Sequence, residues 1–501
     1  MPFRTRLAPV LLTVLLALGA LPSPTRAQVT NSEYAARRAA VAARLDSGVV
    51  VAFGAVEPLS YWPTFFQLPS FQYLTGFGET DAVMVMVKRD SAVTTTMFVP
   101  TLSPVQERWI GARTRVADLQ AKTGIAGQDI AQFPAVVDSL AESGLPFYII
   151  SDVQAAENLG QDSLTRSNRF LSQLRVSHPW LATRSLDTVV SRMRARKSAS
   201  EIGLIRKAAQ ISVRGHREAM KATAPGCGEN EIQALLEGTF RRLGGDRPAY
   251  GSIVGSGLNA TILHYMEDNR VMRDGELLLI DAASSFDHYS ADVTRTLPVS
   301  GKFSPEQREI YQIVRDAQEA FVRQIKPGSA VAASNDSGKA VVTKGLVRLG
   351  LMESATATFD PPAGMTCPAS GCGQQSLYAF HGYGGHGIGL EVHDPAQYYE
   401  AAHRFQPGDV FTVEPGLYFS PELLASLPDT PRNQKMLAKI RPAFEKYKGI
   451  GVRIEDDYAL TASGLEWLST GVPREITEVE TLMRQRVPDL PGGGGCERLR
   501  T

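Results

Sequence analysis

Apolar positions recur with two different periods along this chain, and the change divides it into two parts. Between residues 28 and 185, short apolar runs typical of buried strands alternate with amphipathic, helix-forming stretches. The strand candidates span residues 48–53, 82–88, 94–100 and 145–151. This alternation of strands and helices predicts an α/β amino-terminal domain that ends near residue 185.

From residue 186 the pattern changes to long amphipathic helices followed by short apolar strands. Helical spacing of apolar positions covers residues 186–196, 199–222 and 229–243. Each of three later apolar runs ends on an acidic residue or is followed at once by one; they span residues 276–280, 410–413 and 451–455. We therefore expect an α+β second domain over residues 186–470. Residues 471–501 read as a tail, made flexible by its glycine run.

The first residues of the chain have the pattern of a secretory signal. Arg4 and Arg6 precede an apolar run over residues 7–21, and residues 25–27 offer a small-residue cleavage site. The run is shorter than the roughly 20 residues that span a bilayer. We expect a signal over residues 1–27 and an exported mature protein, periplasmic or secreted. An uncleaved anchor is the alternative.

Composition excludes some classes of partner. Lysine plus arginine and aspartate plus glutamate both number 52, so no net charge favours nucleic acid or an anionic membrane. We expect no nucleic acid partner and, for the mature form, no membrane partner. Four cysteines in an exported chain can form disulfides; they are Cys227, Cys367, Cys372 and Cys496. A Cys367–Cys372 bridge would close a turn-rich loop, whereas Cys227 and Cys496 are either paired or free.

Acidic residues at the ends of apolar strands are the first chemical signal. An unpaired buried carboxylate is costly, and here Asp281, Glu414 and Glu455 each end or follow a buried strand candidate. A cation shared by all three would remove that cost. Read alone, each of these acids is a common capping or turn residue.

Two further residues can join the three acids. Asp292 lies in a β-branched segment that we expect to pair with the strand of Asp281 across a turn at 284–287. His386 stands in a glycine-rich run that lets the backbone approach a metal closely. Four carboxylates and one neutral imidazole would balance two divalent cations and suit manganese, with zinc and cobalt as alternatives. Such metals lower the pKa of bound water, which predicts a hydrolase.

Neighbouring positions offer support for these ligands. Arg453 lies two residues before Glu455, and Thr294 lies two residues after Asp292, so each pair shares a strand face. We expect both residues to orient the ligating carboxylates. His264 follows two apolar residues, a pattern that on its own favours a histidine satisfied within the core.

Residues 186–468 resemble the pita-bread metallopeptidases, the superfamily of methionine aminopeptidase, prolidase, aminopeptidase P and creatinase. The resemblance rests on five motifs in order: Leu263-His-Tyr265, Asp281 with Asp292 and Thr294-Arg-Thr296, His386 with Gly389-Leu-Glu-Val-His-Asp394, Glu414-Pro-Gly416, and Arg453-Ile-Glu-Asp-Asp457. It implies a pita-bread fold for the α+β domain. It also implies two metal ions, bound by Asp281, Asp292, His386, Glu414 and Glu455.

The resemblance further implies roles for the residues around the metals. The acid matching Glu414 shuttles the proton of the attacking water. His264 and His393 match histidines that contact substrate and the tetrahedral intermediate, which replaces the core interpretation of His264. His381 resembles a further supporting histidine, although it precedes His386 by five residues where relatives usually have four. Residues 420–448 are longer than in compact relatives and contain a helical stretch at 433–448.

Residues 70–113 resemble the amino-terminal domain of aminopeptidase P and prolidase, through Phe71-Gln-Tyr-Leu-Thr-Gly-Phe77 and Glu107-Arg-Trp-Ile-Gly-Ala-Arg113. In aminopeptidase P, a tryptophan of a neighbouring subunit reaches the active site, and Trp109 looks like its counterpart. This implies a homo-oligomer, either a dimer or a tetramer. The alternative is an aromatic residue packed within its own domain.

Together these motifs indicate an exported aminopeptidase that removes the first residue of peptides with proline in second position. A prolidase, which cleaves only Xaa-Pro dipeptides, would share all five ligands and is the nearest alternative. Leu263-His-Tyr265 and the Trp109 segment favour the aminopeptidase. A non-catalytic relative that binds peptides is the alternative of another class, and the presence of all five ligands argues against it.

Overall fold

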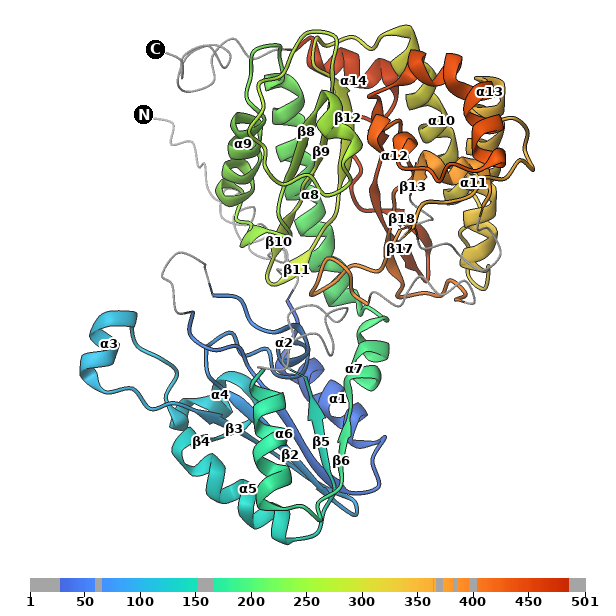
Figure 1. The fold of residues 1–501 in the computed structure, drawn as a ribbon. Coiled ribbons are helices and arrows are strands. Elements are labelled where there is room, and N and C mark those ends of the chain that lie inside the picture. Colours follow the sequence, from blue (N-terminus) through green and yellow to red (C-terminus); the bar gives the residue numbers. More distant parts are fainter. Residues whose placement is uncertain are drawn as a thin grey trace, which may run out of the picture.

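The computed structural model describes residues 28–58, 65–151, 165–363, 365, 373–381, 385–395 and 403–485. These residues form two domains joined through α7 (Figure 1). Within the described ranges, no helix is long and apolar enough to cross a membrane. The expected signal, the glycine run near the carboxyl terminus, Cys367, Cys372 and Cys496 all lie outside the described residues.

A six-stranded mixed sheet forms the centre of the amino-terminal domain, with the strand order β4-β3-β2-β1-β5-β6. Its strands are β1 (Gly48–Phe53), β2 (Val83–Arg89), β3 (Ala92–Val99), β4 (Ala126–Asp129), β5 (Phe147–Ile150) and β6 (Thr183–Ser185). Every residue of β1 is buried, with Val50 facing one hydrophobic cluster and Val51 facing the other. This burial on both faces explains why the sequence of β1 is continuously apolar.

Helices cover both faces of this sheet, which confirms the expected α/β class. The helices of the domain are α1 (Asn31–Ala42), α2 (Pro69–Thr75), α3 (Pro104–Ile110), α4 (Leu119–Thr123), α5 (Phe133–Glu142) and α6 (Arg166–Ser177). Buried residues of α1 and α2 pack in the larger hydrophobic cluster, whereas those of α5 and α6 pack in the smaller one. By contrast, α3 has no buried residue and projects from the domain (Figure 1).

The second domain is α+β, as expected. Among its described residues the strands form four three-stranded sheets, in the orders β11-β10-β7, β12-β9-β8, β13-β15-β16 and β14-β17-β18. In chain order they are β7 (Arg247–Pro248), β8 (Ile253–Ser256), β9 (Leu277–Asp281), β10 (Ser284–Phe286), β11 (Tyr289–Ser290), β12 (Thr294–Pro298), β13 (Phe380–His381), β14 (Val410–Val413), β15 (Gly416–Tyr418), β16 (Gly451–Arg453), β17 (Asp456–Thr461) and β18 (Gly464–Trp467).

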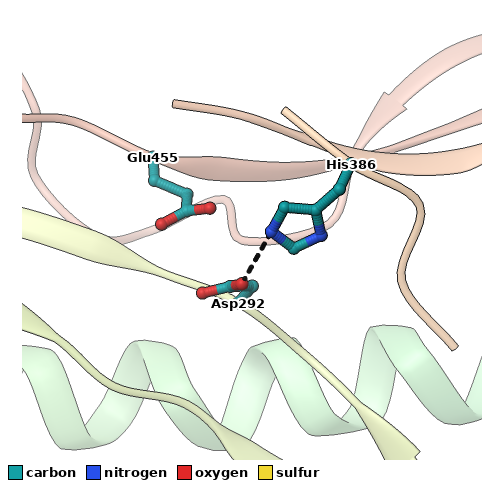
Figure 2. A group of neighbouring side chains, drawn as sticks. All are labelled: Asp292, His386 and Glu455. Atoms are coloured by element: carbon teal, nitrogen blue, oxygen red, sulfur yellow. Dashed lines mark ion pairs between the residues drawn. The ribbon is translucent and has the colours of Figure 1, made fainter. Parts of the chain in front are cut away.

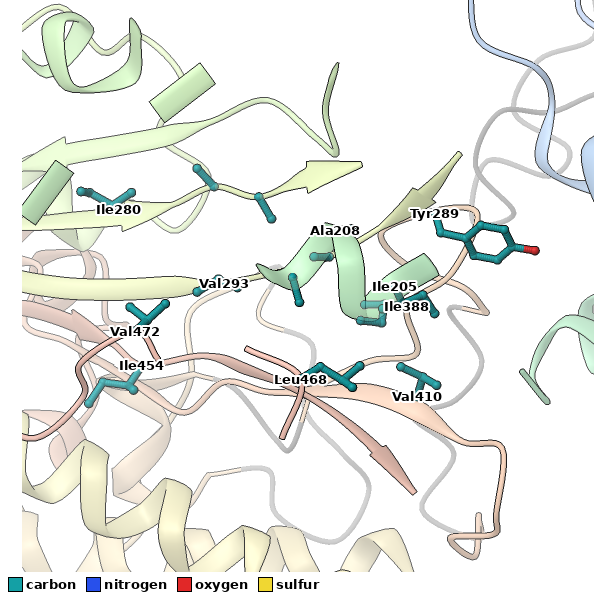
Figure 3. Packing of buried hydrophobic residues seen from close by; sticks show 14 of the residues in the cluster. Ile205, Ala208, Ile280, Tyr289, Val293, Ile388, Val410, Ile454, Leu468 and Val472 are labelled. Carbon is teal, nitrogen blue, oxygen red and sulfur yellow. The ribbon is translucent and has the colours of Figure 1, made fainter. Parts of the chain in front are cut away.

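Long helices flank these strands (Figure 1). The helices from the domain junction onward are α7 (Asp187–Arg194), α8 (Ala199–Ala222), α9 (Glu229–Arg242), α10 (Pro305–Val322), α11 (Val331–Arg348), α12 (Pro421–Ala425), α13 (Pro431–Tyr447) and α14 (Ile476–Met483). Ile205 of α8, Ile280 of β9 and Val410 of β14 belong to one buried cluster (Figure 3). One core therefore joins elements from both halves of the domain.

The two halves of the domain meet along β12 and β16. Thr296 Oγ1 and the backbone of Arg453 exchange hydrogen bonds of 3.1 Å, and the Glu455 N–H donates to the Thr294 carbonyl at 3.1 Å. This seam places Asp281, the last residue of β9, opposite Glu455, the residue before β17.

Buried charges connect the two domains. Arg37 of α1 lies 3.2 Å from Glu201 of α8, and Tyr289 donates a 2.9 Å hydrogen bond to the same carboxylate. Arg194 of α7 donates to Ser70 Oγ at 3.2 Å. Because Arg37, Glu201 and Arg194 are all at least 94% buried, the domains are held together by specific polar contacts as well as by apolar packing.

Three local features differ from the expectations. Part of the expected tail over residues 471–501 is folded, because α14 buries Val479 and Leu482 against the second domain. The strand of Asp281 pairs with β12, but β10 and β11 form a separate hairpin between them. Asp292 therefore lies in the link after β11 rather than within a strand. The helix expected at 433–448 forms as α13, which starts earlier because Pro431 suits a first helical turn.

Cys227 is disulfide-bonded. The residue precedes α9 and is almost fully buried. Of the two options left open by the sequence, paired or free, the paired state is the one observed.

Candidate metal centre

Three of the five expected ligands meet where the halves of the second domain join. Ligand atoms of Asp292, His386 and Glu455 all lie within 4.8 Å of one another, and the three residues are 4%, 5% and 1% exposed. His386 Nε2 is 3.3 Å from Asp292 Oδ2. Figure 2 shows the two carboxylates and the imidazole directed toward a common centre.

The other two expected ligands, Asp281 and Glu414, border this centre. Asp281 ends β9, and the Tyr250 hydroxyl lies within hydrogen-bond distance of both Asp281 Oδ1 and Asp292 Oδ1. Glu414 follows β14, and its Oε1 is 3.4 Å from His386 Nε2. All five expected ligands therefore form one cluster, in which the Glu414 side chain is the most open at 19% exposure.

Glycine determines how His386 enters the cluster. Gly385 has a left-handed φ of 76°, and a Cβ atom there would lie 2.1 Å from the Thr412 carbonyl oxygen. The backbone can therefore run directly against β14, where the His386 N–H donates to Thr412 Oγ1 at 3.1 Å. Thr412 Oγ1 in turn lies 3.2 Å from Glu414 Oε1, so one hydroxyl contacts two ligand residues.

The acids in the cluster repel one another. Burial, followed by the charges of Asp281 and Glu414, raises the pKa of Asp292 well above its usual value. Burial, followed by Asp292 and Glu414, likewise raises the pKa of Glu455. Glu455 Oε1 is also a buried oxygen without a hydrogen-bond partner among the described residues. An orphaned carboxylate oxygen among mutually repelling acids and one imidazole fits the donor set of divalent cations such as manganese or zinc.

Arg453 and Thr294 contact the expected ligands Asp281 and Glu455, from the strand positions that their spacing predicts. Arg453 pairs with Asp281 Oδ2 at 2.5 Å, and Arg453 Nε donates to Thr294 Oγ1 at 3.2 Å. The Thr294 hydroxyl donates to Glu455 Oε2 at 2.6 Å. One buried chain of hydrogen bonds thus fixes carboxylates from both halves of the domain.

Three residues that contact this centre were not predicted from the sequence. Besides Tyr250, they are Tyr418, whose hydroxyl accepts from Arg453 Nη1 at 2.7 Å, and Asp457, whose carboxylate accepts from the Asp292 N–H. Asp457 had a signal, because it is the second of two acids after Glu455. Tyr250 and Tyr418 had none, since their importance depends on tertiary contacts.

His393 lies beside the centre, at the end of a tight loop that begins after His386. The two imidazole rings are 4.2 Å apart, centroid to centroid. The loop closes through a 2.7 Å bond from the Asp394 N–H to the Gly387 carbonyl. Arg194 lies 2.9 Å from the Asp394 carboxylate, which ties this loop to the junction between the domains.

His264 and His381 occupy more open positions. His264 is exposed, so the core interpretation made from its apolar neighbours is wrong. The Leu263 carbonyl accepts a 3.4 Å hydrogen bond from Arg453, which places this loop at the edge of the centre. His381 is exposed on β13, and Glu414, Arg453 and His264 all act on it electrostatically.

Trp109 is not part of this cluster. It lies on α3, is 81% exposed, and belongs to the helix that projects from the amino-terminal domain (Figure 1). The alternative of an aromatic residue packed within its own domain is therefore wrong.

Comparisons with known proteins agree with this architecture. Residues 203–462 match the model of metallopeptidase family M24, and residues 34–146 match that of the aminopeptidase P amino-terminal domain. The chain is 33% identical to a Xaa-Pro aminopeptidase of Haemophilus influenzae, over 91% of this chain and 98% of that protein. A solved structure of Escherichia coli aminopeptidase P with the inhibitor Pro-Leu is similar, with a TM-score of 0.75, 31% identity, and coverage of 91% of this chain and 99% of that one. A zinc-substituted form of that enzyme with product gives a TM-score of 0.76 at 29% identity, covering 92% of this chain and 100% of that one.

Proposed function

We propose that this chain, which belongs to metallopeptidase family M24, is an exported aminopeptidase that releases the first residue of peptides with proline in second position. The observation that carries the proposal is the cluster of Asp281, Asp292, His386, Glu414 and Glu455, within a chain that matches Xaa-Pro aminopeptidases over nearly its whole length. An imide bond to proline has no N–H and a fixed φ, so its cleavage requires a dedicated site.

Two divalent cations would be held by these five residues, manganese being our first choice and zinc or cobalt the alternatives. When bound, such cations act as Lewis acids and lower the pKa of water, which supplies a nucleophile near neutral pH. The donor set supports this choice because it is rich in oxygen, contains one imidazole and lacks a thiolate.

The protein's own residues would move protons and hold charge. Glu414, the most open of the acids, accepts a proton from the attacking water and delivers it to the departing proline nitrogen. His393 and His264 stabilise the charge that develops on the scissile carbonyl oxygen. His381 supports this region from β13. The position of His393 beside His386, and of the His264 loop beside Arg453, supports these roles.

We also propose a homo-oligomer in which α3 contacts a second copy of the chain. Val105 and Trp109 are 68% and 81% exposed on a helix without buried residues. An apolar arm of this kind is typical of a surface that a partner covers. Trp109 would then contribute to the active site of the neighbouring copy.

Export is supported by two independent features. Residues 1–27 have the charge and apolar pattern of a secretory signal. Cys227 is disulfide-bonded, and disulfides persist mainly in oxidising compartments. The mature protein would thus be periplasmic or secreted.

A peptide series tests the activity. Purified protein supplied with manganese, zinc or cobalt should release arginine from Arg-Pro-Pro and leave Arg-Ala-Pro uncleaved. Activity on Arg-Pro but not on Arg-Pro-Pro would identify a prolidase instead. Metal binding without hydrolysis of any of these peptides would favour a non-catalytic peptide-binding protein. Mass spectrometry of the exported protein would test cleavage after Ala27.

A further inference from the structure

The buried carboxylate of Glu229 lies beneath the loop that carries His264. This loop segment, residues 256–270, begins at the last residue of β8, contains a short 3-10 helix at Gly257–Thr261, and leads to the segment before β9. Glu229, the first residue of α9, is 0% exposed and accepts hydrogen bonds from four loop residues. Its Oε1 accepts from the Ser256 N–H (2.6 Å), Ser256 Oγ (2.7 Å) and Asn259 Nδ2 (3.2 Å), and its Oε2 accepts from the Tyr265 hydroxyl (3.0 Å) and the Arg270 N–H (3.0 Å).

Among the residues that the structure describes, Glu229 makes no direct ion pair, and its carboxylate is held by hydrogen bonds. Five donors replace its hydration, and its place in the first turn of α9 is favourable for a negative charge. The outer side of the same loop is open to solvent, since Leu258 and Met266 are 53% and 57% exposed. The Glu229 carboxylate therefore holds the inner side of the loop by hydrogen bonds, whereas the outer side of the loop is open to solvent.

The anchors bracket His264 closely. On one side, the Leu263 carbonyl accepts from Arg453, which also pairs with the metal-centre residue Asp281. On the other side, Tyr265 is 6% exposed and bound to Glu229. With its two neighbours fixed, His264 is left exposed and directed away from the core.

We propose that Glu229, acting through Tyr265, is a positioning residue that holds His264 in place for catalysis. The proposal rests on the proposed function, in which His264 stabilises charge on the scissile carbonyl. A positioning residue acts only through the group it positions. Loss of Glu229 or Tyr265 should therefore lower kcat, leave KM nearly unchanged, and have no further effect once His264 is absent.

The test is a double-mutant cycle with Tyr265→Phe and Glu229→Gln, each alone and combined with His264→Ala. Tyr265→Phe removes one hydrogen bond to a charged acceptor and should lower kcat on Arg-Pro-Pro about tenfold, with KM within about twofold. Glu229→Gln places an NH₂ group where an acceptor is needed and should lower kcat further. In the His264→Ala background, Tyr265→Phe should change kcat by less than about twofold.

A matched control separates positioning from general stability. Glu480 is also a buried carboxylate that accepts from a backbone N–H, that of Phe303 at 3.0 Å, but it lies on α14 and pairs with Arg308. Glu480→Gln should leave kcat and KM unchanged. If Tyr265→Phe lowers kcat as much in the His264→Ala background as in the wild type, the proposal is wrong. Tyr265→Phe also serves as the folded variant should Glu229→Gln fail to fold.

Hydrogen exchange keeps this test separate from that of the proposed function. If the wild type hydrolyses none of the peptides, the proposed function fails, while the anchoring can still be measured. Amides of residues 256–270 should exchange at least about tenfold faster in Tyr265→Phe than in the wild type, and those of α14 should not. Unchanged exchange in the loop would overturn the anchoring role.

Discussion

Glu455 and Asp456 are adjacent, fully buried acids, and replacing each by its amide should have opposite effects on the metal-free protein. Glu455 faces other carboxylates, and burial together with Asp292 raises its pKa. Asp456 is also buried, but Arg295 at 2.6 Å and Arg474 at 3.0 Å lower its pKa below the usual value. One carboxylate thus destabilises the metal-free fold when ionised, and the other stabilises it.

The expected magnitudes follow from these surroundings. Burial and the neighbouring acids oppose ionisation of Glu455 in the folded protein, whereas the unfolded chain ionises it freely, so at pH 7 metal-free Glu455→Gln should gain about 1–3 kcal/mol. For a unit the size of the second domain, this corresponds to a rise in Tm of about 2–5 °C. Asp456→Asn breaks a buried ion pair and should cost about 3–5 kcal/mol. Metal at 100 times its Kd should stabilise the wild type by about 2.7 kcal/mol, and this gain should be lost in Glu455→Gln but kept in Asp456→Asn.

Thermal unfolding is measured on protein treated with EDTA and on the same protein after manganese is added. The first measurement gives the effect of each substitution on the metal-free protein, and the second gives the stabilisation by metal. The two variants control for each other, because both replace a buried acid at adjacent positions. A lower Tm for metal-free Glu455→Gln, or a manganese-induced rise in Tm that survives this substitution, would refute the assignment of Glu455 as a ligand. Loss of the manganese effect in Asp456→Asn would show that the effect reports general stability.

Three further predictions concern the surroundings of the site. Arg194→Met should destabilise the protein by about 3–5 kcal/mol in urea and lower kcat, because Asp394 beside His393 loses its buried partner. Burial raises the pKa of Asp268 to about 6 in the folded protein. Between about pH 4 and pH 6 the unfolded chain has therefore already released this proton, whereas the folded protein still holds it. The free energy of unfolding of the wild type should accordingly fall as the pH rises through this range. Asp268→Asn should therefore be more stable than the wild type at pH 8, by about 1–3 kcal/mol after allowance for screening, with no difference below pH 4 in unfolding free energy. Trp109→Ala should weaken the oligomer in sedimentation velocity and lower activity, and an unchanged sedimentation coefficient would contradict a role for α3 in assembly.

The proposed metal ligands were accessible from sequence because several of them violate a local rule. Asp281 ends an otherwise apolar strand and Glu414 directly follows another, and His386 lies in a glycine run that lets the backbone approach closely. Such conflicts between burial and charge are visible without tertiary structure. Tyr250 and Glu229 violate no rule, since a tyrosine near a strand and a glutamate in a first helical turn are ordinary.

The sequence predicted burial wrongly where one local pattern was compatible with both a buried and an exposed position. The two apolar residues before His264 suggested a core position, but Tyr265 takes the inward place and the histidine faces out. The glycine run led us to expect a flexible tail from residue 471. Val479 and Leu482 nevertheless have helical spacing and pack in the core as part of α14. Which face of a short segment is buried depends on the partner that covers it, and that information lies elsewhere in the chain.

The polar contacts between the domains restrict how this architecture can be recombined. Arg37 and Ser70 belong to the amino-terminal domain, yet they contact Glu201 and Arg194, and Arg194 also holds the loop of His393. A chimaera that replaced residues 28–185 with an unrelated domain would remove Arg37 and leave Glu201 as a buried acid without this cation. Exchange of this domain between homologous proteins should therefore succeed only when the contacting residues travel with it, so the two domains are expected to be inherited as one unit.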